Sequence, residues 1–204
     1  MEHSVKNGLF LLKKDLFAAF RQRRPHVLAW AGVLLVGVAI GIYIGVYVGE
    51  KEQPFGVFAA LFNLEFAPFH YLVPDFLRFF LFSLLVFAAI FLPPAPLYPA
   101  LALFFFGKHF GEISCVCFQS DSLPSALLSI LLVYLPLLLF GGLLLIYLAQ
   151  RAMGNKNRSI GAFCPQAIRV EALLWLKIHL LYFAVLFLLY VVLCGALYLF
   201  AIAL

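Results

Sequence analysis

The stretch Phe104-Phe-Phe-Gly-Lys-His-Phe-Gly-Glu112 gathers the residue types of this chain that are best suited to chemistry. Lys108, His109 and Glu112 bring together a cation, an imidazole and a carboxylate. Lys108 and Glu112 are spaced i, i+4, so on a helix they share one face and can pair. An imidazole beside them, with an unperturbed pKa of about 6.5, could relay a proton. The stretch therefore suggests either a proton or ion pathway or a hydrogen-bonded cluster that fixes helix register.

The remaining sequence offers no catalytic, cofactor-binding or metal-binding pattern. It has no serine with a base at useful spacing, no His-Glu-x-x-His and no glycine-rich loop that could cradle phosphate. Cys115-Val-Cys117 is the one close pair among four cysteines. Small apolar residues on a helix explain this pair better than a metal or redox site does. We therefore expect a protein that is not an enzyme and that holds neither cofactor nor metal.

The composition is that of a membrane protein with several spans. Of the 204 residues, 66% are hydrophobic and 11% are charged, and the mean hydropathy is +1.09. A spanning helix takes about 20 residues, so the length leaves no room for a soluble domain of ordinary size. The net charge of +5 suits loops near anionic lipid rather than a nucleic-acid partner.

Long apolar runs predict an all-α bundle of five transmembrane helices. The expected spans are about 27–48, 76–92, 97–118, 124–148 and 174–204. The Pro93-Pro-Ala-Pro96 segment and Pro99 cannot sustain a regular helix, so they should form the turn between the second and third spans. In the fourth span, Pro136 and the Gly141-Gly142 pair predict a kink or a close contact. The last run exceeds one crossing, which predicts tilt or an interfacial first turn.

The charges of the connecting segments orient this bundle. The charged residues of the loop 49–75 are mostly acidic, whereas the loop 149–173 carries the basic residues Arg151, Lys156, Arg158 and Arg169. Because basic loops stay in the cytoplasm, we expect 149–173 inside and 49–75 outside. Five spans with a cytoplasmic N-terminus and an outside C-terminus satisfy both conditions. The expected organisation is a single transmembrane domain, 25–204, in the cell membrane.

Two amphipathic helices are predicted outside the spans. In the cytoplasmic segment 1–24, apolar residues recur at helical spacing beside basic ones, as in a helix that lies in the membrane interface. Packing on the protein's own cytoplasmic loops is an equal alternative. In the outer loop, Pro54 can begin a helix with one aromatic face, formed by Phe55, Phe58, Phe62 and Phe66. This face either lies on the outer leaflet or docks an extracytoplasmic partner.

Glycines recur every fourth residue in two of the predicted spans. They are Gly37, Gly41, Gly45 and Gly49 in the first span, and Gly107 and Gly111 in the third. A helix face without side chains lets another backbone come close, so the two glycine faces are candidates to pack together. Contact with a second protein is the alternative, and a homo-oligomer is compatible with it.

The predicted spans set Lys108, His109 and Glu112 in the middle or outer half of the third helix. Arg78 is the nearest second contributor, but its side chain can snorkel to the outer interface. Since no other predicted span supplies a matching deep acid or base, we interpret the three residues as a packing cluster. A small transporter or channel that uses them is the alternative.

Two segments, with the five spans and the basic N-terminus, resemble the stage II sporulation protein M family. They are Leu103-Phe-Phe-Phe-Gly-Lys-His-Phe-Gly111 and Leu131-Leu-Val-Tyr-Leu-Pro136. The likeness covers roughly residues 76–153, and elsewhere it is one of topology. It implies a non-enzymatic membrane scaffold, because members in endospore formers localise a peptidoglycan amidase and a lytic transglycosylase at the septum during engulfment. The aromatic face of the outer loop would then belong to the partner surface.

Overall fold

The computed structural model of the chain is all-α, as the sequence predicts. Its helices are α2 (Arg24–Tyr47), α4 (Pro68–Ala88), α5 (Leu97–Phe118), α7 (Leu135–Ser159) and α8 (Pro165–Ala203). The structure describes residues 24–47, 68–89, 92, 94–118, 130–131, 135–159 and 165–203. The predicted interfacial helix before Arg24, the aromatic face formed by Phe55, Phe58, Phe62 and Phe66, and Gly49 lie outside these residues.

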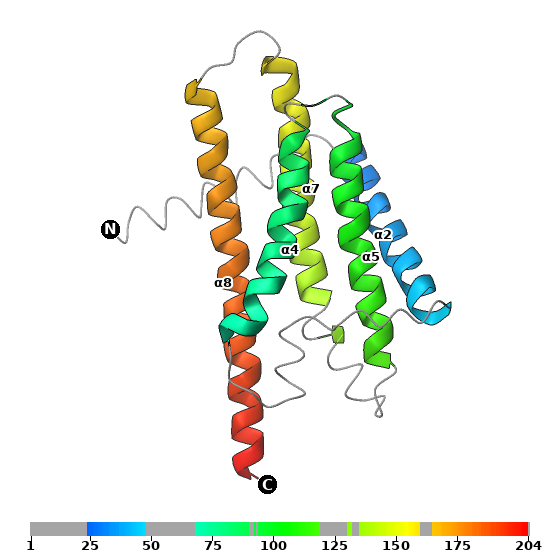
Figure 1. Ribbon diagram of the computed structural model, residues 1–204, viewed down its shortest axis with the longest axis vertical. Helices are drawn as coiled ribbons and strands as arrows, with labels where there is room; N and C mark the ends of the chain where they lie inside the picture. Colours follow the sequence, from blue (N-terminus) through cyan, green and yellow to red (C-terminus); the bar gives the residue numbers. More distant parts are fainter. Residues whose placement is uncertain are drawn as a thin grey trace.

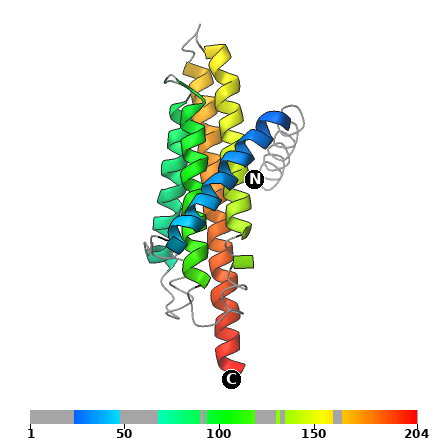
Figure 2. The same ribbon diagram turned by 90° about the vertical axis from the view of Figure 1, so that its right-hand side faces the viewer.

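The described helices form one bundle in which successive helices run in opposite directions (Figure 1). α2 crosses the bundle obliquely over α5 (Figure 2), and α5 is its principal neighbour. α7 contacts the other four helices, and 61% of its apolar span is buried, against 17% for α2 and 22% for α8. α7 is therefore the central helix, and α2 and α8 flank it.

Within the described residues, three helical stretches are long and apolar enough to cross a membrane: Pro25–Tyr47, Leu135–Gly154 and Glu171–Leu189. Large apolar side chains on α2 and α8 point outward, among them Leu35, Tyr43, Leu180 and Leu188. Such faces are stable against lipid and not against water. These features indicate a multi-pass membrane protein.

Proline lies in the first turn of several helices. α4 begins at Pro68, inside the predicted outer loop, so the predicted start of the second span at about 76 is wrong. α7 is described from Leu135 onward, with Pro136 in its first described turn, and most of the predicted segment 124–134 lies outside the described residues. A first-turn proline costs nothing, because the N–H that it lacks would have no partner inside the helix. Pro99 likewise lies in the first turn of α5 and not in the preceding turn.

The predicted cytoplasmic loop 149–173 is also largely helical. α7 continues through the charged residues to Ser159, and α8 begins at Pro165. Lysine, arginine and glutamine are good helix formers, so a fall in hydropathy marks where a helix leaves the apolar layer and not where it ends. By contrast, the bounds of α5 coincide with the predicted third span.

The core of the bundle is strongly aromatic. Phe79 of α4 and Tyr182 of α8 are fully buried, and their rings stack with centroids 3.8 Å apart. Phe106 of α5 meets Phe79 edge-on and also contacts Gly141 of α7. Such ring pairs add about 0.5–1.5 kcal/mol each beyond the area that they bury. The aromatic core thus holds α4, α5, α7 and α8 together.

Candidate functional site

The glycine faces of α2 and α5 meet inside this chain. A Cβ atom on Gly37 would collide with the carbonyl oxygen of Phe104, and one on Gly41 with that of Lys108. In the reverse direction, a Cβ on Gly107 or Gly111 would collide with backbone carbonyls of α2. The two backbones are therefore in direct contact, as in other small-residue helix pairs.

The same contact continues toward the C-terminal end of α2. Gly45 faces the side chain of Cys115, a free buried cysteine whose thiol donates a hydrogen bond of 3.3 Å to the carbonyl of Ile42. Cys115 thus serves helix packing, in agreement with the interpretation of this residue as small and apolar. Between the described parts of α2 and α5, the glycine contact leaves no room for a solute.

This contact positions Lys108 and Glu112 on α5. Their side chains form an ion pair along one helix face. The Glu112 side chain is 1% exposed, whereas that of Lys108 is 24% exposed. A carboxylate at this depth is costly unless a cation accompanies it. Lys108 therefore compensates Glu112 and keeps its own stem and ammonium nearer to the surface.

α4 supplies a second half to this cluster, against the prediction that no other helix would. Nη1 of Arg78 lies 2.9 Å from Nε2 of His109 and 3.9 Å from Oδ1 of the buried Asp75. Arginine can only donate, so Nε2 of His109 accepts, and the imidazole is neutral with its proton on Nδ1. Arg78 thus reaches His109 of α5 while 40% of its side chain stays exposed.

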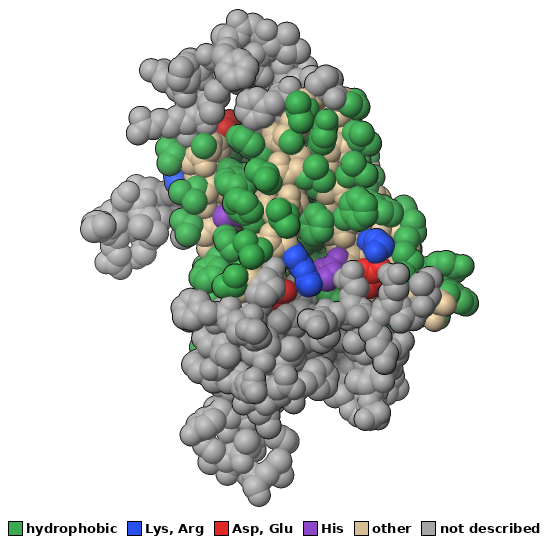
Figure 3. All heavy atoms as spheres, in the orientation of Figure 1, with side chains coloured by type: hydrophobic (Ala, Val, Ile, Leu, Met, Phe, Trp, Pro, Cys, Tyr) green, Lys and Arg blue, Asp and Glu red, His purple; other side chains and the backbone are tan. Residues whose placement is uncertain are grey.

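We call Asp75, Arg78, Lys108, His109 and Glu112 the α4–α5 polar cluster. Its two cations and two carboxylates compensate one another around a neutral imidazole. In Figure 3 basic, acidic and histidine side chains lie side by side across one face, at the edge of the hydrophobic surface. The sequence missed Asp75 as a member because the late predicted start of the second span left it in a loop.

A second polar site joins α4 to α8. Oγ of Ser83 lies 2.6 Å from Nε2 of His179, and Nδ1 of His179 lies 2.7 Å from the carbonyl oxygen of Trp175. Ser83 is fully buried and His179 is 3% exposed. The sequence has no serine with a base at useful spacing, and this pair comes together only in the fold. The two residues are 96 positions apart, and no local pattern in the sequence connects them.

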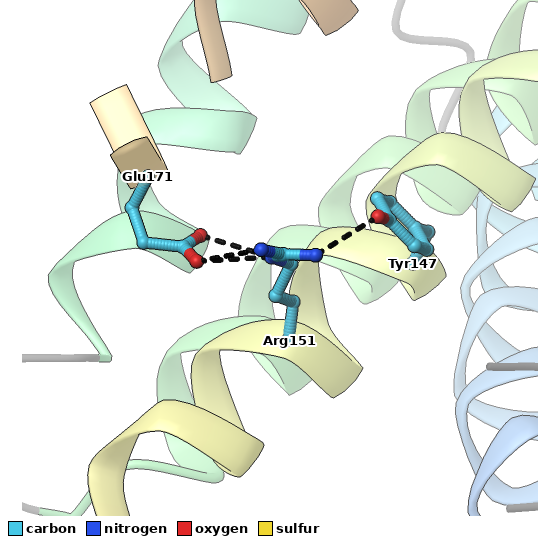
Figure 4. Close-up of polar contacts among 3 residues, drawn as sticks. All are labelled: Tyr147, Arg151 and Glu171. Atoms are coloured by element: carbon cyan, nitrogen blue, oxygen red, sulfur yellow. Dashed lines mark hydrogen bonds and ion pairs between the residues drawn. The ribbon is translucent and has the colours of Figure 1, made fainter. Parts of the chain in front are cut away.

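Close to this pair, an ion pair ties α7 to α8. Nε of Arg151 donates to both carboxylate oxygens of Glu171, at 3.0 and 3.1 Å, and Nη1 donates to the hydroxyl of Tyr147 at 3.3 Å (Figure 4). A two-pronged arginine–carboxylate pair of this kind fixes both distance and orientation. Arg151 and Glu171, which the sequence assigned to a loop, thus brace two helices.

A cavity of about 20 Å³ separates the ion pair from Ser83. Three helices line it, with polar groups from Ser83, Arg151, Glu171 and Trp175. Such a volume holds about one water molecule. A serine bonded to a histidine is also the arrangement of an activated nucleophile. Because Ser83 is fully buried and the cavity cannot admit an acyl group, we assign it no nucleophilic role.

Among the described residues, no three His, Cys, Asp or Glu side chains lie close enough together to hold a metal ion. Comparisons of the chain with protein-family models, with curated proteins and with solved structures found no match. A functional proposal for this chain therefore rests on the geometry of the two polar sites and of the glycine contact.

Proposed function

We propose that the chain crosses the cell membrane five times, with a cytoplasmic N-terminus and an outside C-terminus. The opposite directions of successive helices support this topology. The positive-inside rule supports it as well, since the region that contains Arg151, Lys156 and Arg158 is basic and the first connection is acidic. In this orientation the α4–α5 polar cluster lies toward the outer side and the Arg151–Glu171 pair toward the cytoplasm.

Within this topology, the protein acts as a non-enzymatic scaffold. The observation that carries the proposal is the backbone contact of α2 with α5, which closes the route between these helices to any solute. The compensated charges of the α4–α5 polar cluster beside it favour a fixed arrangement. The broad apolar outer faces of α2 and α8 remain available to lipid or to a membrane partner.

The resemblance to the stage II sporulation protein M family suggests which partners such a scaffold would hold. They are cell-wall hydrolases, a peptidoglycan amidase and a lytic transglycosylase, gathered during endospore engulfment. Phe55, Phe58, Phe62 and Phe66 would contribute to their docking surface. The proposal includes no cofactor and no nucleic-acid partner, and it is compatible with a homo-oligomer.

Photo-crosslinking in native membranes tests the scaffold. A crosslinking amino acid at Phe58, and a second at the exposed Tyr47 near the outer end of α2, should recover a cell-wall hydrolase. The matched control is Leu28, which is exposed at the other end of the same helix and should yield lipid adducts. Lipid adducts alone from all three positions would count against the proposal.

The α4–α5 polar cluster favours a second candidate, a small transporter or channel that uses Lys108, His109 and Glu112. Its basis is that α4 contributes Asp75 and Arg78, so the cluster joins two helices. Glu112→Gln should then abolish flux in proteoliposomes made from the folded fraction, whereas Glu171→Gln should leave it. Equal flux in both variants would remove this candidate.

A further inference from the structure

The two nitrogens of His179 have partners of different kinds. Nδ1 lies 2.7 Å from the carbonyl oxygen of Trp175, which can only accept, so Nδ1 carries a hydrogen. Nε2 lies 2.6 Å from Oγ of Ser83, and a hydroxyl both donates and accepts. Oγ is also 2.7 Å from the carbonyl oxygen of Phe80. Nε2 is thus the nitrogen whose protonation can vary.

The Ser83 hydroxyl has one hydrogen and two acceptors within reach. When His179 is neutral, the hydroxyl donates to Nε2. When His179 is protonated, Nε2–H donates to Oγ and the hydroxyl turns to the carbonyl of Phe80. Both charge states therefore keep every ring nitrogen bonded, and only a hydrogen atom has to move. An unsatisfied buried donor would cost about 1–3 kcal/mol, and neither state incurs that cost.

Burial disfavours an imidazolium at His179, and the aromatic rings around it offset part of that cost. The ring of Trp175 lies 4.1 Å away, and those of Phe80 and Phe79 lie 5.4 and 5.5 Å away. Aromatic rings at such distances attract a desolvated cation. Among the side chains that the structure describes, the titratable and charged groups on the surrounding helices are Asp75 and Arg78 on α4, Tyr98, Lys108, His109, Glu112 and Cys115 on α5, Tyr147 and Arg151 on α7, and Glu171, Lys177 and Tyr182 on α8.

The cavity of about 20 Å³ lies beside Ser83 and has room for a water molecule. Ser83, Trp175, Arg151 and Glu171 all contribute to its lining. Nε1 of Trp175 is buried and, within the described part of the chain, has no hydrogen-bond partner. A single water in this cavity would satisfy such an N–H and bring an O–H group next to Ser83.

We propose that Ser83 and His179 form a proton-binding site that water reaches from the Arg151–Glu171 end of the bundle. A hydronium ion in the cavity gives a proton to Oγ of Ser83 while the proton of that hydroxyl passes to Nε2 of His179. One O–H bond breaks and another forms on Ser83, and the products are water and an imidazolium. The site is separate from the α4–α5 polar cluster, and proton binding there goes beyond both the scaffold and the transporter role.

The fluorescence of Trp175 tests proton binding. The chain has two tryptophans, so Trp30→Phe leaves Trp175 alone, and an imidazolium at van der Waals distance quenches an indole. In proteoliposomes of the full chain, fluorescence should fall reversibly as the pH is lowered and the imidazolium forms. His179→Gln should abolish the fall, and His109→Gln should keep it. Constant fluorescence down to the pH at which the bundle unfolds, or a fall that persists in His179→Gln, would overturn the proposal.

A measurement on the chain without substitutions guards against misfolding of a variant. Nitrogen NMR of the chain labelled at histidine should show hydrogen on Nδ1 and a bare Nε2 at high pH for both His109 and His179, and the test follows the signal of the His179 side chain. The same side chain should carry hydrogen on both nitrogens at low pH. If every histidine signal that changes belongs to another residue, the proposal fails even where His179→Gln does not fold.

The side of entry is tested by setting the pH separately inside and outside the vesicles. The fluorescence of Trp175 should follow the pH on the side of the membrane where Arg151 and Glu171 lie. An impermeant label at a cysteine introduced at Lys156 identifies that side. A response that follows the opposite side would overturn the assigned route.

Discussion

The α2–α5 contact and the α4–α8 contact join helices in opposite ways. Between α2 and α5, glycines bring two backbones together, and a methyl group would already collide. Between α4 and α8, aromatic rings stack and the hydrogen-bonded pair of Ser83 with His179 crosses the interface. The first contact has a single arrangement, because close-packed backbones cannot shift to make room. The second has two arrangements of one hydrogen atom within the same heavy-atom geometry.

One bundle thus contains a rigid region and an adaptable one. The α4–α5 polar cluster lies next to the rigid contact, and its charges compensate one another. The Ser83–His179 pair lies next to a cavity and carries no fixed charge. A change of protonation is therefore easier to accommodate at the α4–α8 contact than at the α2–α5 contact.

The largest effect should come from filling the glycine contact. Gly41→Leu would force α2 away from the backbone of Lys108, and we expect a loss of about 4–5 kcal/mol or of the folded bundle altogether. Gly32→Leu is the control, since nothing lies within 4 Å of a Cβ at Gly32. Thermal stability in detergent and size-exclusion profiles measure both. Equal stability of the two variants would remove the distinction between a rigid and an adaptable contact.

Removing one buried charge should have the next largest effect. Glu112→Gln leaves Lys108 without its ion-pair partner on α5, and we expect a loss of about 3 kcal/mol. The double variant Lys108→Met with Glu112→Gln should recover part of this loss, because no lone charge remains. The free energies of unfolding of the single variants and of the double variant, measured in a denaturing detergent, give the coupling between Lys108 and Glu112. A double variant with the full sum of the two single losses would show that the pair is not coupled.

A smaller effect is expected at the α4–α8 contact. Ser83→Ala removes the donor to Nε2 of His179, which should cost about 1–2 kcal/mol at pH 8. Combining it with His179→Phe replaces both polar partners by apolar groups in an aromatic environment, and the double variant should be closer to the original stability. Unfolding in the same detergent compares the variants. A double variant less stable than Ser83→Ala would contradict the prediction.

The smallest effect should have the opposite sign. The hydroxyl of Tyr182 is buried and has no hydrogen-bond partner among the described residues, so Tyr182→Phe should be neutral or stabilising by up to about 1 kcal/mol. Tyr147→Phe is the matched control. The hydroxyl of Tyr147 accepts a hydrogen bond from Arg151, so its removal should destabilise the fold. Thermal unfolding of the two variants side by side is the measurement. A Tyr182→Phe variant less stable than Tyr147→Phe would show that the Tyr182 hydroxyl has a partner.

The sequence predicts those features that depend on local spacing. Glycines four residues apart indicate a smooth helix face whatever the rest of the fold, and the i, i+4 spacing of Lys108 and Glu112 indicates an ion pair on any helix. The all-α class follows from hydropathy alone. The bounds of α5 also follow, because a proline-rich segment precedes it and polar residues come after it.

The features that sequence reasoning missed depend on how separate helices face one another. Hydropathy alone does not show that Pro68 can begin a helix, so the predicted start of α4 is wrong. The start of α4 in turn decides whether Asp75 lies in a loop or faces the bundle. The Ser83–His179 pair depends on the rotation of α8 about its axis, which hydropathy does not specify for a helix that is apolar on all sides.

The preference of α2 for α5 has a consequence for the assembly of the protein in the membrane. α2 packs mainly on α5 and next on α7, and about 50 residues separate the end of α2 from the start of α5. At about 5–20 residues per second, the ribosome needs several seconds to make that stretch. During this interval α5 has not been made, so the glycine face of α2 has no helix to pack against. The nascent chain must therefore hold its first helix in the lipid or in the insertion machinery until the third described helix emerges.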